Sequence, residues 1–221
     1  MKLWQLKDPR GGRFAVAGGR GKWSDPPSRR VQPLIVEWEP GSDLIGDFTW
    51  SGLGIVVTER VGKMLLERFS GFELGPVEMI QNPKLKRPQR TTRRTRPRIW
   101  LPYQGPPLYE LWVTAWVDAD LQRSTLEARG LHPDFGHMCY QVHGVEQVDV
   151  CWDREALKGH VVRTPREPGK GVYVAEGALR GIDIFNLAQL PGLDHCTDRV
   201  RDFIFEQQFT NVDFLEMGEA F

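Results

Sequence analysis

The sequence predicts an α+β fold with mixed or antiparallel sheets, a few amphipathic helices and two similar strand–helix–strand units. Three observations predict it. Short segments rich in Val, Ile and aromatic residues are separated by Gly and Pro, a pattern typical of strands and turns. Apolar side chains recur at helical spacing after Thr58 and again after Thr197. Each of these two expected helices has an apolar strand-like segment before it and another after it.

The size and composition are those of a soluble globular protein. The chain has 221 residues, of which 40% are hydrophobic and 26% charged, which is enough for two lobes around a sizeable core. No apolar run approaches the ~20 residues of a membrane helix, and the N-terminus lacks the apolar core of a signal peptide. The sequence has three cysteines, an odd and small number that does not suit a disulfide framework: Cys139, Cys151 and Cys196. We therefore expect residues 1–221 to form a single unit with two lobes in the cytoplasm.

The first strand–helix–strand unit is expected at about residues 34–80. Apolar side chains on one face predict its helix, which Thr58 is expected to cap and Ser70-Gly71 to end. The expected elements are, in order, strands at 34–38 and 55–57, a helix at 58–69, and a strand at 72–79 that is interrupted at Gly75-Pro76.

Between the two units, the sequence predicts a long loop and further strands. Residues 80–107 are rich in Pro and basic residues, so we expect an exposed loop there. Residues 109–117 alternate in polarity with large apolar side chains on both faces, which predicts a central strand. The remaining expected elements are a short helix at 121–128, a hairpin at 138–152 that turns near Gly144, and a strand at 171–175.

The second unit, at about residues 172–218, matches the first. Thr197-Asp198-Arg199-Val200 corresponds to Thr58-Glu59-Arg60-Val61, and Asp183 precedes its unit as Asp47 precedes the other. Duplication and convergence both account for these matches. In either case we expect core and helix caps at these positions. Neither Thr is expected to act as a nucleophile, because activation requires a base and only His195 is near in sequence.

The charge is balanced overall but unevenly distributed. Residues 1–98 carry 19 basic and 10 acidic side chains, whereas residues 99–221 carry 10 and 19. The acidic C-terminal part is suited to steering a basic partner, unless it is only one end of a dipolar surface. Lys84–Arg98 holds eight basic residues and no acidic one. Clustered Lys and Arg side chains bind phosphates, so this segment is either a nucleic-acid-binding element or a solvated loop.

The motifs of common enzymes are absent from the sequence. It has no Walker phosphate loop, no dinucleotide-binding Gly pattern, no His-Glu-x-x-His helix and no Gly-x-Ser-x-Gly elbow. The only metal-like group consists of Cys139, Cys151, His132, His137 and His143. Its two Cys are too far apart for the usual zinc spacing, and buried thiols are the alternative. We therefore expect no catalytic residues, no cofactor and no metal. An unfamiliar enzyme site around His132, Asp134, His137 and Cys139 is a further hypothesis.

The chain resembles the double-CxxCG motif proteins, found mainly in myxobacteria, which include immunity proteins of swarming-inhibition toxin systems. The resemblance rests on motifs that occur in the same order, at residues 47–61, 106–114, 169–173, 181–185 and 196–214. In place of the two Cys-x-x-Cys-Gly motifs, this chain has residues 17–21 and 132–136, which keep the Gly and lack all four Cys. A tetrahedral zinc site needs four ligands, so the resemblance implies a member that has lost the metal.

The resemblance implies an immunity protein that binds and neutralises a cognate bacterial toxin in the cytosol by surface complementarity, without catalysis. Interfaces of this kind are anchored by aromatic and Arg side chains inside a polar rim. The candidate partner-contact residues are Trp112, Trp116, Asp118, Asp120, Asp149, Asp153, Arg93 and Arg94. A membrane partner is not expected, and a homo-oligomer is compatible with the sequence. A nucleic-acid-binding or regulatory protein that uses residues 84–98 is the alternative function.

Overall fold

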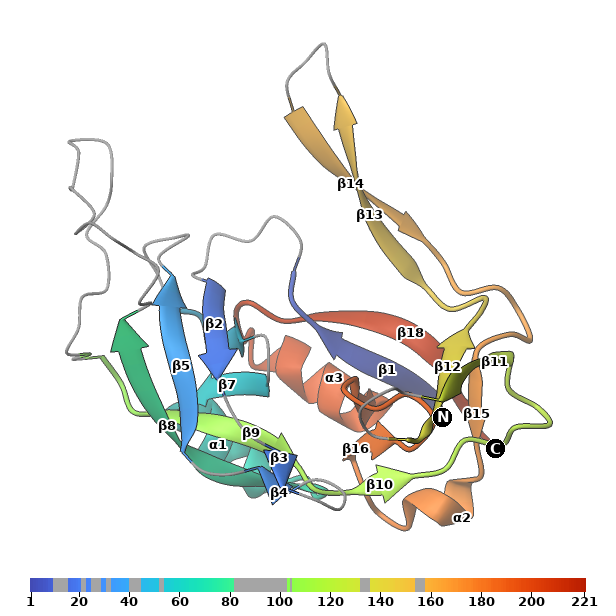
Figure 1. Ribbon diagram of the computed structural model, residues 1–221, viewed down its shortest axis with the longest axis horizontal. Coiled ribbons are helices and arrows are strands. Elements are labelled where there is room, and N and C mark those ends of the chain that lie inside the picture. The colour runs from blue at the N-terminus through green and yellow to red at the C-terminus, as the bar shows by residue number, and fades with distance from the viewer. Residues whose placement is uncertain are drawn as a thin grey trace.

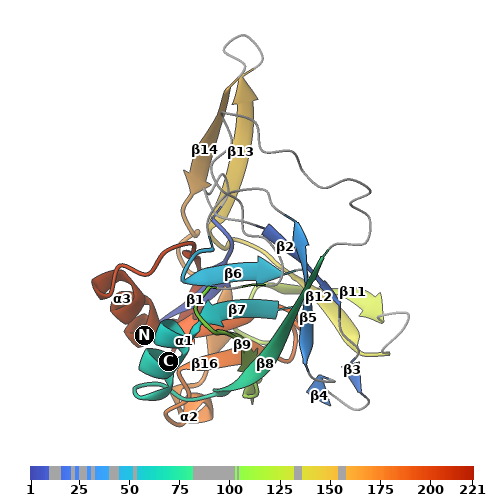
Figure 2. The ribbon, with the colours of Figure 1, turned by 90° about the vertical axis from the view of Figure 1, so that its left-hand side faces the viewer.

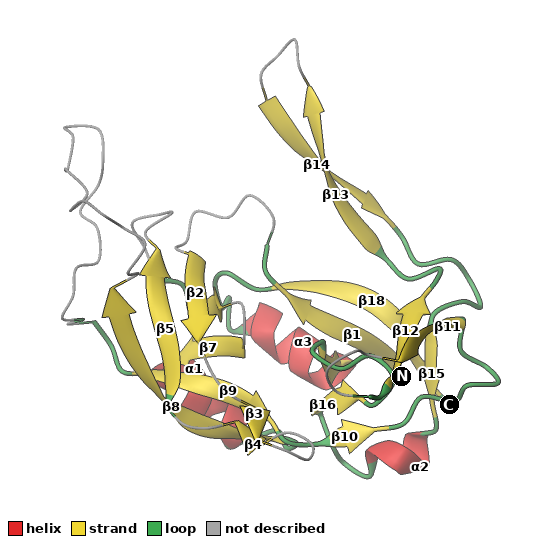
Figure 3. Ribbon diagram, viewed as in Figure 1, coloured by secondary structure: helices red, strands yellow, loops and turns green. Residues whose placement is uncertain are grey.

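A computed structural model of the chain describes residues 1–9, 16–20, 23–24, 29–30, 33–39, 45–51, 54–81, 103, 105–131, 136–153 and 158–221. Strands dominate the described part of the structure, and its helices are short, as Figure 3 shows. In the described part of the chain, no helix is both long and apolar enough to cross a membrane.

The predicted α+β fold with two strand–helix–strand units is wrong, because the architecture is mostly β. The described helices are α1 (Glu59–Leu66), α2 (Glu176–Leu179) and α3 (Asp198–Glu206), and all are short. A helix of this length buries only a narrow apolar stripe. The two strands that flank α1 are also not neighbours in a sheet, and neither are those that flank α3. A strand from a distant part of the chain lies between them in both cases, so the curled sheets determine the fold.

The first sheet is a closed barrel of six strands. In order around the barrel they are β2 (Val16–Arg20), β5 (Leu34–Glu39), β8 (Phe72–Gln81), β9 (Leu108–Val113), β7 (Gly54–Thr58) and β6 (Phe48–Ser51). Strand β9 lies between β7 and β8 and is antiparallel to both. Leu34, Val36 and Val56 form a buried apolar cluster of their own. The barrel and α1 are called the first lobe below.

The second sheet also has six strands. Their order is β10 (Trp116–Val117), β16 (Ile184–Leu187), β17 (Asp194–Thr197), β1 (Lys2–Lys7), β18 (Asp213–Ala220) and β15 (Val172–Val174). Strand β1 lies between β17 and β18 and is antiparallel to both. The N-terminal segment therefore supplies a central strand, although its sequence shows no sustained period. This sheet, α2 and α3 are called the second lobe below.

The two sheets share one strand order. Strands β15, β18, β1, β17 and β16 follow one another in the same directions as β5, β8, β9, β7 and β6. In each lobe, the helix begins directly after the strand that ends at Thr58 or Thr197. One apolar cluster joins the lobes, because it contains Val61 and Leu65 of α1 together with Val200 and Phe203 of α3. Figure 1 shows the lobes side by side, with α3 near the centre.

Three two-stranded sheets complete the described structure. They pair β3 (Trp23–Ser24) with β4 (Arg29–Arg30), β11 (Leu126–Leu131) with β12 (Met138–Val142), and β13 (Gln147–Asp153) with β14 (Lys158–Thr164). The predicted hairpin at 138–152 is therefore wrong. Gly144 does turn the chain, but the Gly144 carbonyl accepts from Glu167 and the Glu146 N–H donates to Glu216, so β12 and β13 do not pair.

The helix predicted at 121–128 is wrong, and most of the loop predicted at 80–107 lies outside the described residues. In place of the helix, a turn is followed by β11, because the Asp120 carboxylate accepts hydrogen bonds from two backbone N–H groups of that turn. The part of the loop outside the described residues includes Lys84–Arg98.

The matched aspartates Asp47 and Asp183 bind the helix of their own lobe in the same way. The Asp47 carbonyl accepts from the Thr58 N–H at 3.1 Å, and the Asp183 carbonyl accepts from the Thr197 N–H at 3.0 Å. The side chains form ion pairs with an Arg of the following helix, Arg60 with Asp47 at 3.0 Å and Arg199 with Asp183 at 2.8 Å. Neither Thr hydroxyl forms the predicted cap hydrogen bond, so these aspartates and not the threonines fix the two helix starts.

The same two aspartates bind the turn that follows the helix of the opposite lobe. Asp47 accepts from the Thr210 N–H and hydroxyl, both at 2.9 Å, and Asp183 accepts from the Ser70 N–H at 3.4 Å. The arginine stacking is also reciprocal. Arg60 lies 4.9 Å from the Phe209 ring centroid, and Arg199 lies 5.7 Å from that of Phe69. Each aspartate therefore joins a helix start in one lobe to a helix end in the other.

We predict that Asp183→Ala lowers the free energy of unfolding by about 2 kcal/mol, because it removes a buried acceptor from Arg199 and from the Ser70 N–H. Urea unfolding followed by circular dichroism measures the change. Asp202→Ala is the matched control, since Asp202 is exposed and, among the described residues, its ion pair is with Arg201 at 2.9 Å. It should change stability by less than about 0.5 kcal/mol. Equal losses in the two variants would contradict the role given to Asp183.

Candidate functional site

The hairpin formed by β13 and β14 projects from the body of the protein, as Figures 1 and 2 show from two directions. The two strands pair in register from Gln147 opposite Thr164 to Asp153 opposite Lys158. They form a sheet of their own, so within the described residues neither strand has a neighbour on its outer edge. We call residues 147–153 and 158–164 the projecting hairpin.

The projecting hairpin exposes apolar side chains. Val150, Val161 and Val162 are 46%, 51% and 39% exposed. Val150 lies opposite Val161, so the two share one face, whereas Val162 lies opposite Asp149 on the other face. An isolated two-stranded hairpin is only marginally stable in water, and apolar side chains gathered on a surface mark interaction sites. These features make the hairpin the candidate contact element.

Ion pairs fix the foot of the projecting hairpin to β18. Arg163 of β14 pairs with Glu146 and with Asp213, and it also donates to the Phe214 carbonyl. The Glu146 N–H donates to the Glu216 carbonyl, and the Glu146 carboxylate accepts from the Glu216 N–H in return. The hairpin is therefore held in a defined position, although its length extends into solvent.

Beyond the hairpin, Arg166 is almost fully buried, with a side chain that is 7% exposed, and it pairs with Glu216 and Glu219. Burial raises the pKa of the Glu216 carboxyl, but hydrogen bonds from Lys2 and Arg166 outweigh this effect and lower that pKa overall. Glu216 is thus ionised at neutral pH, which keeps this ion-pair network intact.

A groove of about 290 Å³ lies at the foot of the hairpin. Its lining includes Trp4, Arg201 and Phe205 together with Arg163. The Arg201 guanidinium lies 4.1 Å from the Trp4 ring centroid and 5.1 Å from that of Phe205, which is 54% exposed. Aromatic and Arg side chains are the residues that most often anchor protein interfaces. The groove therefore extends the candidate surface from the hairpin onto α3.

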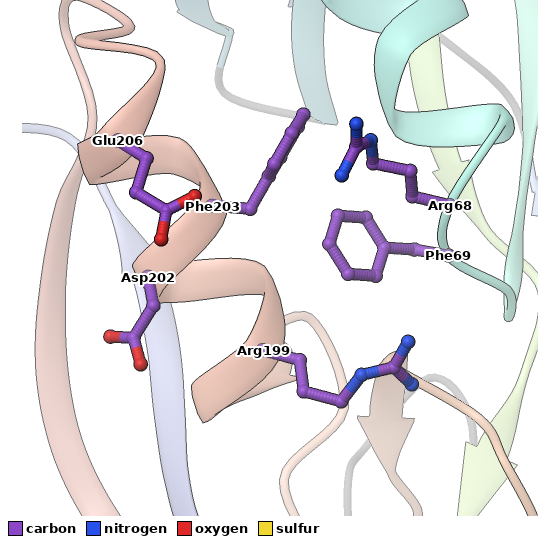
Figure 4. Close-up of a pocket in the computed structure, with 6 residues that line it drawn as sticks. All are labelled: Arg68, Phe69, Arg199, Asp202, Phe203 and Glu206. Atoms are coloured by element: carbon purple, nitrogen blue, oxygen red, sulfur yellow. The ribbon is translucent and has the colours of Figure 1, made fainter.

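A second groove, of about 340 Å³, lies between α3 and the residues that follow α1. Figure 4 shows Phe69 and Phe203 pointing toward each other, with Arg68 and Arg199 on either side of Phe69. The two rings lie 5.3 Å apart in an edge-to-face contact, and Arg68 lies 4.9 Å from the Phe203 ring. Both rings belong to the cluster that joins the lobes. This groove therefore has a structural role already, and the projecting hairpin is the better candidate site.

The structure separates the predicted partner-contact residues. Asp149 is exposed on the hairpin, and Asp153 ends strand β13 of the same hairpin. Trp112 is half-buried on β9, and Trp116 is 39% exposed on β10, which Figure 1 shows on the opposite side of the molecule from the hairpin.

The other predicted contact residues are accounted for in different ways. Asp118 accepts from Gln189 at 3.1 Å, and Asp120 holds the turn before β11. Arg93 and Arg94 lie outside the described residues. Val150, Val161, Val162 and Phe205 were not among the predicted contact residues. The sequence signal for the three valines was a pair of short Val-containing segments on either side of residues 154–157, and Phe205 lies in the helix that was interpreted as core and cap.

The residues of the predicted metal-like group lie on different elements. Cys139 is on β12 and Cys151 is on β13, which belong to separate sheets. His143 contacts Glu127 at 2.8 Å, whereas His132 and Asp134 lie outside the described residues. Among the residues that the structure describes, no group of three or more His, Cys, Asp or Glu side chains is arranged to hold a metal ion.

His195 of β17 is fully buried within the second lobe, where its ring stacks on Phe185 with centroids 5.9 Å apart. Burial lowers the pKa of His195 to about 4. The imidazole is thus neutral at physiological pH. Thr197, the neighbour considered above as a nucleophile, donates its hydroxyl to Asp183 at 3.5 Å. Both side chains therefore act as structural groups in the interior.

Comparison with known proteins finds no matching family model and no match among curated proteins.

We predict that His195 makes the protein less stable in mild acid. The unfolded chain takes up the proton near pH 6.5 and the folded protein only near pH 4, so stability is lost progressively as the pH falls between these values. The contribution amounts to about 2 kcal/mol between pH 7 and pH 5. Urea unfolding of the wild type and of His195→Leu at both values measures it. Equal pH dependence in the two proteins would show that His195 does not titrate in this way.

Proposed function

We propose that the protein is an immunity protein of the bacterial cytoplasm, which binds a protein toxin and neutralises it by covering part of its surface, without catalysis. The observation that carries the proposal is the projecting hairpin, with Val150 and Val161 exposed on one face and no neighbouring strand described on either edge. The class of partner comes from the resemblance of the sequence to toxin-immunity proteins.

The fixed position of the hairpin supports a binding role. Its foot is fixed by Arg163, Glu146 and Asp213, so little conformational entropy is lost when a partner contacts it. The adjoining groove offers Phe205 and Arg201 as anchors. The exposed valines lie next to the ion pairs of the foot, as an interface core lies next to a polar rim. The alternative, a nucleic-acid-binding role for residues 84–98, concerns a segment outside the described residues and remains a prediction.

We predict that the double variant Val150→Ser, Val161→Ser weakens toxin binding at least about tenfold, because each change removes apolar area from the interface at little cost to the fold. The probe is the toxin domain encoded beside the gene of this protein, and calorimetry gives the affinity. In co-expression, the wild type should protect cells and the double variant should protect them less.

Leu66→Ser and Leu131→Ser are the matched controls, since these side chains are 47% and 67% exposed on α1 and β11, away from the hairpin. Both should bind as the wild type does. A double hairpin variant with unchanged affinity would remove the hairpin from the interface. Failure of the wild-type protein to co-elute with the toxin domain would refute the immunity function itself.

A further inference from the structure

We propose that the outer edge of β13 accepts a strand from the partner, and that this strand alternates Lys or Arg with apolar side chains. The inference rests on the proposed function and deepens it, because it names the chemistry of the segment that the hairpin binds. It is carried by three features of β13: its free edge, the charge of Asp149 and the exposure of Val150.

The first step concerns the backbone. Within the described residues, β13 pairs only with β14, so its outer edge presents a row of backbone N–H and C=O groups. Extended segments bind such edges by adding a strand, with main-chain hydrogen bonds supplying affinity and side chains supplying specificity. A third strand would also turn a marginal ribbon into the smallest sheet that is stable by itself.

The second step concerns charge. Asp149 is exposed and forms no ion pair with any described residue, and the residue opposite it on β14 is the uncharged Val162. A strand added to the free edge would place one side chain directly opposite Asp149, within about 5 Å between Cβ atoms. An acidic side chain there would be repelled, whereas Lys or Arg would pair with the carboxylate. Asp149 therefore selects a basic residue at that position.

The third step concerns the other face. Val150 follows Asp149, points to the opposite face and already lies beside Val161. A third strand would extend this row, and an apolar side chain opposite Val150 would cover area that is now exposed to water. Since side chains alternate along a strand, a basic residue opposite Asp149 and an apolar one opposite Val150 define an alternating basic and apolar sequence.

The edge of β14 is less suitable for the same purpose. Arg163, which lies on this strand, is already paired with Glu146 and Asp213. Val161 and Val162 are consecutive, which removes the alternation of charged and apolar positions. Pro165 directly follows the last residue of β14, and Pro has no N–H to donate to a partner.

The test uses the full-length protein and a short peptide that alternates Lys and Val, with a Glu and Val peptide as the charge control. We expect the Lys peptide to bind at least about tenfold more tightly than the Glu peptide. Asp149→Lys should reverse this order. Glu206→Lys, which makes the same change of charge on exposed α3, should leave it unchanged.

Backbone pairing is tested separately from charge. A Lys and Val peptide with alternate amides N-methylated has the same charge but cannot complete a ladder, and we expect its binding to be lost. Amide hydrogen exchange should show protection by the unmodified peptide on β13 rather than on β14. Equal binding of the methylated peptide, protection confined to β14, or a dimer of the free protein formed through β13 would each overturn the proposal.

The outcomes for the peptide and for the toxin are independent. If the toxin domain binds but leaves the β13 amides unprotected, the strand-addition proposal fails and the immunity function stands. If the Lys peptide adds to β13 but the toxin domain does not bind, the edge is a strand-accepting site and the immunity function fails.

Discussion

Asp47 and Asp183 each accept hydrogen bonds from an arginine of their own lobe and from the turn that ends the helix of the opposite lobe. These contacts set how α1 and α3 lie against each other, and the apolar cluster between the lobes forms around them. Burial raises the pKa of Asp183, and Arg199 opposes that shift. The pKa stays raised overall, so the contacts that align the lobes offset the desolvation of this carboxyl only in part. Loss of either aspartate would leave backbone donors without their acceptor where the lobes meet.

The position of the projecting hairpin depends on this junction. Strand β18 begins shortly after Thr210, the residue that Asp47 binds, and it runs under the foot of the hairpin. Asp213 and Glu216 of β18 form ion pairs with Arg163 and Arg166, so β18 connects the lobe junction to the hairpin foot. The outer part of the hairpin lies beyond these contacts. A fixed base with exposed valines along the strands suits an element that meets a partner without rearranging the body.

Local patterns predicted the elements better than the fold. The strands expected at 34–38 and 55–57 and the helix expected at 58–69 correspond to β5, β7 and α1, because each has a clear apolar period. The matched Asp and Arg residues were identified as well, but not their contacts across the lobes. Strand β1 was missed because both its faces are buried: Leu3 packs into one cluster, Trp4 and Leu6 into another, so no alternation is visible. The predicted fold class was wrong because each sheet contains a central strand from a distant part of the chain. This strand is β9 in the first sheet and β1 in the second. The exposed valines of the hairpin were missed because β-branched residues also suit buried strands, and only their solvent exposure distinguishes the two cases.

The pairing of β1 with β18 places the two ends of the chain side by side, with the Ala220 N–H donating to the Met1 carbonyl at 2.8 Å. If Phe221 were joined to Met1 by a short linker, the elements of the second lobe would follow one another along the chain as β15, β16, β17, α3, β18 and β1. The corresponding elements of the first lobe follow in the same order, as β5, β6, β7, α1, β8 and β9, and only α2 is additional. In a circular version of this protein, the break could therefore be moved to the connection between the lobes without separating any strand from its neighbours.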